Sequence, residues 1–478
     1  GDTAMDSSLI AAVREFDQLG GPRRLPWIGN MLQIDPKRFH TILEGWCAEY
    51  GSPYRFSLAN QHAIVTARAA DIARVLKERP DVFRRIGWIE PTLRELGAHG
   101  VFSAEGAQWR RQRRLVMPAF NPVHLKSFFP SLVRVTRRLR DRWYRAAENR
   151  TPIDLQADLM RFTVDVTAGL AFGIDVNTVE SEHDQIQQHL NCVFTEINRR
   201  GAVPFPYWRY FKLPRDRALD HHLVEVHRAI RSFMDQARAR IERNPALRSR
   251  PENLIEALIC ARDEDGSVLS DVDVAGNVFT ILLAGEDTTA NTLAWMIYLL
   301  NREPEAWRRV AAESDDVLGR HEVLEDIAGA AKLEFTDACI NETMRLKPVA
   351  PVLALGTMRE TVVEGVRLPA NTGVFALTRV EGMKAANFPE PAVFDPSRWL
   401  AEREGREGAK KVLFPFGGGP RFCPGRYLAV LEMKMVMSML SRNFQHPDVY
   451  AKDHREPAEI FNFTMTAEGL TMNVKPRL

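Results

Sequence analysis

The short run from Phe416 to Gly425 is the part of this sequence most suited to chemistry. It reads FGGGPRFCPG, with glycines gathered around a single thiol at Cys423. A thiolate is a strong ligand for iron, and glycines, which have no Cβ, let the backbone lie close against a flat macrocycle. Arg421, two residues before the sulfur, is suited to bind a propionate carboxylate by a charge-assisted hydrogen bond. The run therefore predicts a thiolate-ligated haem; the alternative is an ordinary buried thiol beside a turn.

A second candidate lies within a long helical segment. Ser270 is a typical N-cap, and no proline interrupts the chain from there to Arg302. The centre of the segment, residues 284–289, reads AGEDTT and follows an apolar run. Glycine and carboxylates are unfavourable in a buried helix, so this local violation indicates a functional site.

One face of this helix carries the residues of interest. Positions 280, 283, 284, 287 and 288 lie on it at helical spacing. We expect the Thr288 hydroxyl to bond to an upstream carbonyl and to disturb the helix ladder there. The simpler alternative is that Asp287 and Thr288 only cap or kink the helix.

Three charged residues predict a structural ion network. Glu342 and Arg345 are three apart on a predicted helix and face the same way, and Arg398 is suited to complete a buried triad. Losing one partner of a buried pair costs about 3–5 kcal/mol, so we assign the triad to structure and not to catalysis. The alternative is an exposed pair worth less than about 1 kcal/mol.

Taken in order, these runs resemble the motifs of the cytochrome P-450 family. They are WRRQR at 109–113, AGEDTT at 284–289, ETMR at 342–345 with FDPSRW at 394–399, and the cysteine loop. Each motif is weak alone, but the ordered set is highly specific and spans nearly the whole chain. The resemblance implies a mainly α fold with a large helical domain and a small β-rich subdomain, and haem b between the long central helix and the cysteine loop.

The resemblance also implies roles for individual residues. Gly285 and Ala284 leave room for O₂, Thr288 donates a hydrogen bond during O₂ activation, and Asp287 relays protons from solvent. Trp109 and Arg113, one helical turn apart, share a propionate with Arg421. The full implied haem-binding set is Trp109, Arg113, Ala284, Phe416, Gly419, Arg421, Cys423 and Gly425, with Cys423 as the iron ligand.

The implied activity is that of a haem-thiolate monooxygenase, which inserts one atom of O₂ into a lipophilic substrate by hydroxylation or epoxidation. One alternative is a haem-thiolate peroxygenase or isomerase, although such relatives usually lack the acid–threonine pair present here. A haem-based sensor is a second alternative, but it needs neither proton-relay residues nor an extended apolar wall. The expected wall is lined by Ile86, Trp88, Phe102, Thr280, Leu283, Val352, Leu353 and Phe463.

Bulk composition fits a globular enzyme of 478 residues. Lysine and arginine total 64 against 62 acids, a net charge of +2 that gives no global attraction to nucleic acid. The five cysteines are an odd number without metal-like spacing, which favours a reducing cytoplasm. We expect a single domain over 1–478, with 1–20 as an N-terminal extension.

Partners follow from what the sequence contains. No glycine-rich dinucleotide motif follows a predicted strand, so we expect electrons from a separate ferredoxin or flavodoxin with its reductase. No apolar run of about 20 residues occurs, so we expect no stable membrane insertion. We further expect a cytoplasmic monomer that binds O₂ and a lipophilic small molecule.

Local patterns predict elements near both ends of the chain and one exposed helix face. The β-branched run 64–66 predicts a strand, and the alternating tail 461–474 predicts a closing hairpin. Arginines at 134, 137, 138 and 142 are spaced by threes and fours, which predicts one solvated helix face.

Overall fold

The computed structural model describes residues 13–87, 89–181, 185–203, 205–403, 405–462 and 464–477. The chain divides into two compact units, each defined by its own internal contacts. The first consists of Gly1–Ile89, Ala350–Ala392 and Glu407–Cys423; the second consists of Glu90–Val349, Val393–Arg406 and Pro424–Leu478. The second unit is mainly helical and the first holds most of the strands, as expected from the predicted fold class.

The first unit is built on a mixed five-stranded sheet in the order β2-β3-β9-β6-β4. Its strands are β2 (Tyr54–Leu58), β3 (Gln61–Thr66), β4 (Phe83–Arg85), β6 (Val352–Thr357) and β9 (Gly373–Leu377). The predicted strand at 64–66 is confirmed as part of β3, which runs antiparallel to β2 and parallel to β9. Residues 63–66 are all buried, because this central strand is covered on both faces.

Further elements of the first unit flank this sheet. They are a three-stranded sheet of β1 (Arg14–Glu15), β7 (Thr361–Val363) and β8 (Val366–Leu368), and the helices α1 (Phe39–Tyr50) and α2 (Ala69–Lys77). Helix α2 buries Ile72, Val75 and Leu76, which recur at i, i+3 and i+4. These side chains pack into a core cluster with Ile64 and Val374 of the sheet, so α2 is fixed against it.

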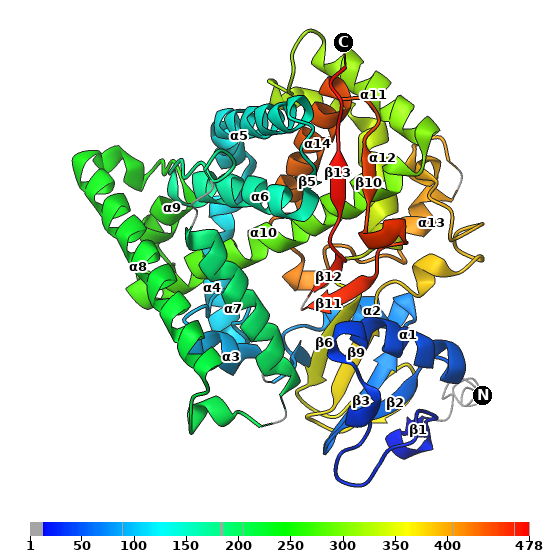
Figure 1. Ribbon diagram of the computed structural model, residues 1–478. Helices are drawn as coiled ribbons and strands as arrows, with labels where there is room; N and C mark the ends of the chain where they lie inside the picture. The colour runs from blue at the N-terminus through cyan, green and yellow to red at the C-terminus, as the bar shows by residue number, and fades with distance from the viewer. Residues whose placement is uncertain are drawn as a thin grey trace, which may run out of the picture. The chain divides into compact units, whose positions relative to one another are not determined.

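The second unit contains most of the helices (Figure 1). They are α3 (Ile89–Glu95), α4 (Gly106–Val116), α5 (Pro122–Glu148), α6 (Leu155–Phe172), α7 (Gln185–Ala202), α8 (Pro214–Arg243), α9 (Leu254–Cys260), α10 (Asp271–Asn301), α11 (Pro304–Leu318), α12 (Glu334–Leu346) and α14 (Arg426–Asn443). The short α13 (Arg406–Lys410) stands where the chain passes from the second unit to the first.

Helix α10 is the central helix of this unit and confirms the predicted long helix. The Ser270 side chain caps it by accepting from the Asp273 amide at 3.1 Å. Its most extensive packing is with α6, and it also contacts α8, α12 and α14. Most of its residues are buried, as the nearly continuous apolar sequence requires.

The carboxyl-terminal tail contributes to two separate sheets: the predicted closing hairpin is confirmed for β11 and β12, but its extent to residue 474 was wrong. β11 (Glu459–Asn462) and β12 (Thr464–Ala467) pair antiparallel. β13 (Thr471–Asn473) instead lies between β10 (Asp448–Tyr450) and β5 (Ile153–Asp154). The sequence alternation extends across both pairings, and the Gln156 side chain binds the turn between them by accepting from the Leu470 amide at 2.9 Å.

The predicted solvated arginine face of α5 is only partly exposed. Arg134 and Arg137 are exposed, but Arg138 and Arg142 are half-buried. Arg138 forms an ion pair with Asp175 at 2.5 Å, and Arg142 pairs with the buried Asp158 at 3.0 Å. The prediction was wrong for these two residues because their acidic partners lie on or after α6, beyond the reach of helical spacing.

Two glycines in helices make a matched test of the packing around α10. A Cβ added to Gly276 of α10 would lie 2.1 Å from the His99 carbonyl oxygen, whereas one added to Gly45 of α1 would meet nothing within 4 Å. We expect Gly276→Ala to lower the free energy of unfolding by about 1–3 kcal/mol through overpacking. Gly45→Ala should raise it by about 0.5–1 kcal/mol through helix propensity.

Thermal unfolding of the two holoprotein variants checks this prediction. The melting temperatures should move in opposite directions from that of the parent protein. A Gly276→Ala protein as stable as Gly45→Ala would show that the His99 carbonyl does not limit the space at α10.

Candidate active site

The cysteine loop of the first unit is held by its own backbone. The Cys423 amide donates to the Phe416 carbonyl at 2.9 Å, and the Gly417 amide donates to the Phe414 carbonyl at 3.1 Å. Gly417 and Gly419 have φ values of +75° and +65°, in the left-handed region that favours glycine. The loop therefore needs glycine at both positions to fold back on itself before the thiol.

The turn Gly419–Arg421 also lies very close to α2. A Cβ on Gly419 would be 2.4 Å from the Leu76 carbonyl oxygen, so no larger residue fits without movement of the backbone. Lys77, the last residue of α2, is exposed beside this turn. Within the first unit, the packing of α2 on the sheet thus fixes one side of the cysteine loop.

The loop leaves part of its apolar surface outside the core of its unit. Phe416, Arg421 and Cys423 are half-buried, and Phe422 is 45% exposed. A half-buried thiol flanked by aromatic and glycine residues fits the edge of a flat, largely apolar group. The residues of this loop therefore fit a haem with Cys423 as ligand. Gly425, in the second unit, caps α14 by accepting from the Ala429 amide at 2.9 Å.

Helix α10 exposes a short stretch in the middle of an otherwise buried helix. Thr280 and Leu283 are buried, Ala284 is exposed, and Asp287 and Thr288 are half-buried. The Thr288 hydroxyl donates to the Ala284 carbonyl at 3.2 Å, the upstream bond expected from the sequence. Of the predicted face, the part from 284 to 288 is thus accessible to a ligand.

Gly285 of the AGEDTT run and Thr280 of the predicted face are both occupied with packing. A Cβ on Gly285 would lie 2.9 Å from the Thr167 hydroxyl of α6, so this glycine allows α6 and α10 to approach closely. The Thr280 hydroxyl donates to the Ala98 carbonyl at 2.9 Å and to the Gly276 carbonyl at 2.7 Å. Both side-chain positions face protein, whereas Ala284 faces the accessible side.

Asp287 is held by two hydrogen-bond donors. Asn291, one turn later on α10, donates to Oδ1 at 3.0 Å, and Thr464 of β12 donates to Oδ2. Burial raises the pKa of Asp287, although the hydrogen bonds from Thr464 and Asn291 act in the opposite direction. A carboxyl with a raised pKa holds a proton more readily near neutral pH than an ordinary aspartate does.

Sequence reasoning did not find these two partners. Asn291 is at i+4 from Asp287, so helical spacing alone was sufficient to indicate it. Thr464 lies 177 residues away in the chain, and no local pattern connects it with α10.

Helix α4 brings Trp109 and Arg113 together. Trp109 is buried, and the Arg113 guanidinium lies over its ring at 5.6 Å from the centroid. Between them in sequence, the buried Gln112 accepts from the Asn277 amide of α10 at 2.5 Å. This contact fixes α4 against the amino-terminal half of α10.

Two other arginines of α4 are paired with an acidic residue outside the helix. Arg111 and Arg114 form ion pairs with Asp263, at 3.5 and 3.2 Å. Their charge is therefore partly balanced by the segment that precedes α10.

Glu342 lies at the centre of a completely buried ion network. Its carboxylate accepts from Arg345 Nε at 2.6 Å and Arg398 Nε at 3.0 Å. It also accepts from Trp399 Nε1 at 3.1 Å and from the Asp395 amide at 2.7 Å. The exposed fractions of Glu342, Arg345 and Arg398 are 0, 0 and 4%. The network joins α12 to the turn Pro396–Trp399.

The predicted pocket residues fall in both units. In the first, Ile86 and Val352 pack against the same core cluster and Leu353 packs against another, and all three remain half-buried. In the second, Phe102 is half-buried. Trp88 and Phe463 lie outside the described residues.

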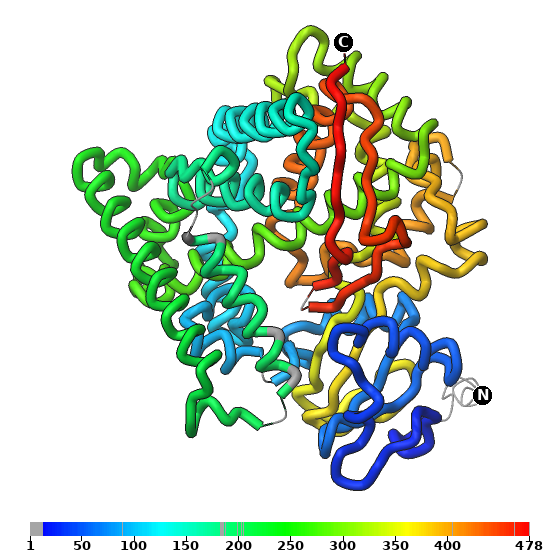
Figure 2. The backbone as a smooth tube through the Cα atoms, in the orientation of Figure 1, coloured from blue at the N-terminus to red at the C-terminus, as the bar shows by residue number. Residues whose placement is uncertain are grey.

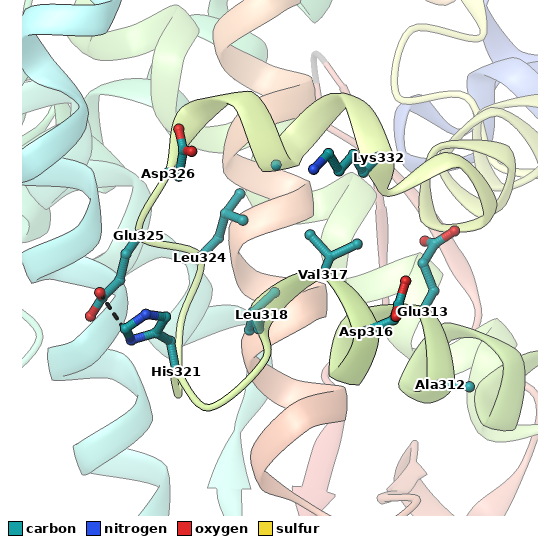
Figure 3. Close-up of a pocket in the computed structure, with 11 residues that line it drawn as sticks. Ala312, Glu313, Asp316, Val317, Leu318, His321, Leu324, Glu325, Asp326 and Lys332 are labelled. Atoms are coloured by element: carbon teal, nitrogen blue, oxygen red, sulfur yellow. Dashed lines mark ion pairs between the residues drawn. The ribbon is translucent and has the colours of Figure 1, made fainter.

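A cavity of about 740 Å³ lies elsewhere in the second unit, between α11 and the turn Ile327–Lys332 (Figure 3). Its walls include Val317, His321 and Lys332, and none of the predicted site residues lines it. Its rim is charged, and Glu325 is paired with His321 at 3.0 Å. These charged side chains do not provide the apolar walls that a lipophilic substrate requires.

The described residues contain neither a cluster of metal ligands nor a membrane-spanning helix. No group of three or more histidine, cysteine or acidic side chains is placed to hold a metal ion in that part of the chain. Among the helices described, none combines the length and the apolar character that a membrane span requires.

Comparison with known proteins identifies the family. Residues 19–474 match the family model described as cytochrome P-450. The chain is 29% identical to cyclooctatin synthase of Streptomyces melanosporofaciens, over 87% of this chain and 84% of that protein. It is also 29% identical to cytochrome P-450 4F12 of Homo sapiens, over 82% of this chain and 75% of that protein.

A third relative carries a further domain. It is a bifunctional cytochrome P-450/NADPH–P-450 reductase of Acremonium egyptiacum, 27% identical over 89% of this chain but only 40% of that protein.

The chain belongs to the cytochrome P-450 family. It is therefore a haem-thiolate monooxygenase with haem b as cofactor, using O₂, a lipophilic substrate and electrons from a redox partner.

The Glu342 network gives a graded prediction for stability. Glu342→Ala leaves two arginines uncompensated in the core, so we expect a loss of about 3–5 kcal/mol in the free energy of unfolding and poor haem retention. Trp399→Phe removes one donor and keeps the charges, and should cost only about 1 kcal/mol. Haem content and melting temperature of the purified variants check the order; equal losses would show that the charges do not dominate.

Proposed function

We propose that this enzyme inserts one atom of O₂ into an unactivated C–H or C=C bond of a lipophilic substrate, with the residues predicted from the sequence in the roles given below. The observation that carries the proposal is the acid–threonine pair on α10. Burial raises the pKa of Asp287, two donors fix its carboxyl, and the Thr288 hydroxyl donates to the carbonyl of the exposed Ala284. Peroxide-driven and isomerising haem enzymes have no need of such a proton-handling pair.

The Cys423 thiolate is proposed as the iron ligand. When bound, a thiolate-ligated haem supplies the O₂ activation and O–O cleavage chemistry. Phe416, Gly419 and Gly425 fit contact with the macrocycle, because they are apolar or lack a side chain. Arg421 is proposed to bind a propionate by a charge-assisted hydrogen bond.

Trp109 and Arg113 of α4 are proposed as further propionate donors. The indole N–H and the guanidinium both donate, and the cation–π contact between the two side chains holds them on one side of the helix. Ala284 is proposed to leave space over the haem, and Gly285 allows that position through the α6–α10 packing.

Proton handling is proposed for Asp287 and Thr288. The Asp287 carboxyl takes up a proton more readily than an ordinary aspartate, because burial disfavours its charged form and raises its pKa. The Thr288 hydroxyl, one residue later, donates to the Ala284 carbonyl and would be the donor available to a bound oxygen species if that bond were released. The hydroxyl of Thr464 and the amide of Asn291 keep the carboxyl in one orientation.

The substrate pocket is proposed to be lined by the mostly apolar residues predicted from the sequence. Ile86, Val352 and Leu353 are half-buried in the first unit, and Phe102 and Leu283 belong to the second. Thr280, Trp88 and Phe463 complete the proposed lining. Such walls fit a lipophilic molecule of moderate size.

Electrons are proposed to come from a ferredoxin or flavodoxin with its reductase, in the cytoplasm. Lys77, Lys410 and Lys411 are exposed in the unit that carries the cysteine loop, and Lys77 lies beside the Gly419–Arg421 turn. Exposed cations in the unit that carries the cysteine loop favour the docking of an acidic electron carrier.

Product formation under two regimes tests the proposed reaction. With ferredoxin or flavodoxin, its reductase, NAD(P)H and O₂, we expect oxygenated lipophilic product; with peroxide alone we expect almost none. Product only with peroxide would support a peroxygenase, and product in neither case a sensor. As a control on the ligand, Cys423→Ser should lose the red-shifted Soret band that the reduced, carbon-monoxide-treated parent shows.

The pH dependence of turnover tests Asp287. If its protonated form donates, product-forming turnover falls as pH rises through its raised pKa. Asp287→Asn should lower turnover about 10²-fold or more and abolish this inflection. Thr464→Val removes a bond that lowers the pKa, so the inflection should move to higher pH, while Thr464→Ser should leave it in place.

Protein stability gives an independent check of the same pKa. Charging the buried carboxyl costs stability, so the parent loses stability relative to Asp287→Asn as pH rises through the raised pKa. The two melting temperatures should converge below the ordinary aspartate pKa of 3.8. A difference that does not change with pH would contradict the assignment.

A further inference from the structure

Three histidines lie together between α7 and α8, and none of them has been assigned a role above. The two helices lie side by side and are in extensive contact (Figure 2). His189 belongs to α7, and His221 and His222 belong to α8. The ring centroids are 5.0 Å apart for His189 and His222, 6.0 Å for His189 and His221, and 5.8 Å for His221 and His222.

The inner pair is already in direct contact. Nδ1 of His189 and Nδ1 of His222 are 2.7 Å apart, so one ring donates a proton to the lone pair of the other. Both rings are half-buried, whereas His221 is exposed. Two imidazole nitrogens of different helices therefore point at the same position.

We propose that His189 and His222 form a binding site for a borderline divalent cation, Zn²⁺ or a similar ion, that replaces their shared proton and links α7 to α8. Imidazole nitrogen is a preferred ligand of zinc, copper and nickel. A zinc ion with Zn–N bonds of about 2.0–2.1 Å in tetrahedral geometry places two ligand nitrogens about 3.4 Å apart. Separating the two nitrogens by less than about 1 Å is sufficient.

His221 is placed to become a third ligand. Three imidazoles bound to one zinc have ring centroids roughly 5 Å apart, close to the separations seen here. In the described chain no three ligand side chains already converge on one point, so His221 must rotate toward the pair or water must complete the coordination.

The acidic residues next to the histidines of α8 already form ion pairs. Asp220 and Glu225, on either side of the histidine pair in α8, form ion pairs with Lys212 and with Arg228, the latter at 2.7 Å. Their carboxylates are thus engaged by cations, and the ligands of the proposed site are the imidazole nitrogens.

Zinc titration of the chelator-treated holoprotein tests the proposal, with calorimetry and equilibrium dialysis as the measurements. We expect one Zn²⁺ per chain, weaker binding at lower pH because protons compete, and a melting temperature that rises with Zn²⁺. His189→Ala and His222→Ala should each lower the affinity at least tenfold, since even an outer partner of a metal ligand contributes about 10–100-fold. His221→Ala should lower it less.

Two further variants keep the test decisive. His222→Gln retains a side chain that can form a hydrogen bond to His189, so the contact between α7 and α8 can be kept. We expect this variant to lose the zinc-dependent rise in melting temperature all the same. His321→Ala removes an exposed histidine outside these helices and should bind zinc as the parent does. The proposal would be overturned if the parent did not bind zinc. It would also be overturned if His189→Ala and His222→Ala bound zinc as tightly as the parent.

Discussion

The second unit depends most on the hydrogen bonds and ion pairs of the buried Glu342 carboxylate. It lies in the core with no exposure and is satisfied by at least five hydrogen bonds, from two arginines, one indole and one backbone amide. Burying an ion costs several kcal/mol, and only such complete pairing repays that cost. The network therefore tolerates one arrangement of α12 and of the segment Pro396–Trp399, and this specificity is what it contributes beyond stability.

Helix α10 is also held in one position, in its case by close packing at two glycines. Gly276 and Gly285 allow a loop carbonyl and α6 to approach the helix, and each would clash if it carried a Cβ. Glycine lowers helix propensity by about 1 kcal/mol, so the helix accepts an intrinsic loss in return for contact. Fixed on these sides, the helix presents Ala284 and Thr288 on its remaining accessible face.

The sequence was most informative where function forces a local pattern. The N-cap Ser270, the bounds of α10 and the strand at 64–66 could be predicted because each depends on neighbours in the chain. The arginines of α5 and the tail at 461–474 could not, because their partners, such as Asp158 and β10, are distant in sequence. The pairing of Asp287 with Asn291 was accessible from helical spacing, but that with Thr464 was not.

The contrast between the two partners of Asp287 explains why an acid–threonine motif is insufficient alone. With only Asn291 beside it, the carboxyl would lose one of the two hydrogen bonds that act against burial, and its pKa would rise further. The Thr464 hydroxyl, brought by β12 from the end of the chain, donates to Oδ2 and so limits this rise. The tail hairpin thus sets the electrostatics of a residue on the central helix. A change at Thr464 therefore shifts the pKa of Asp287 without changing any residue of the motif itself.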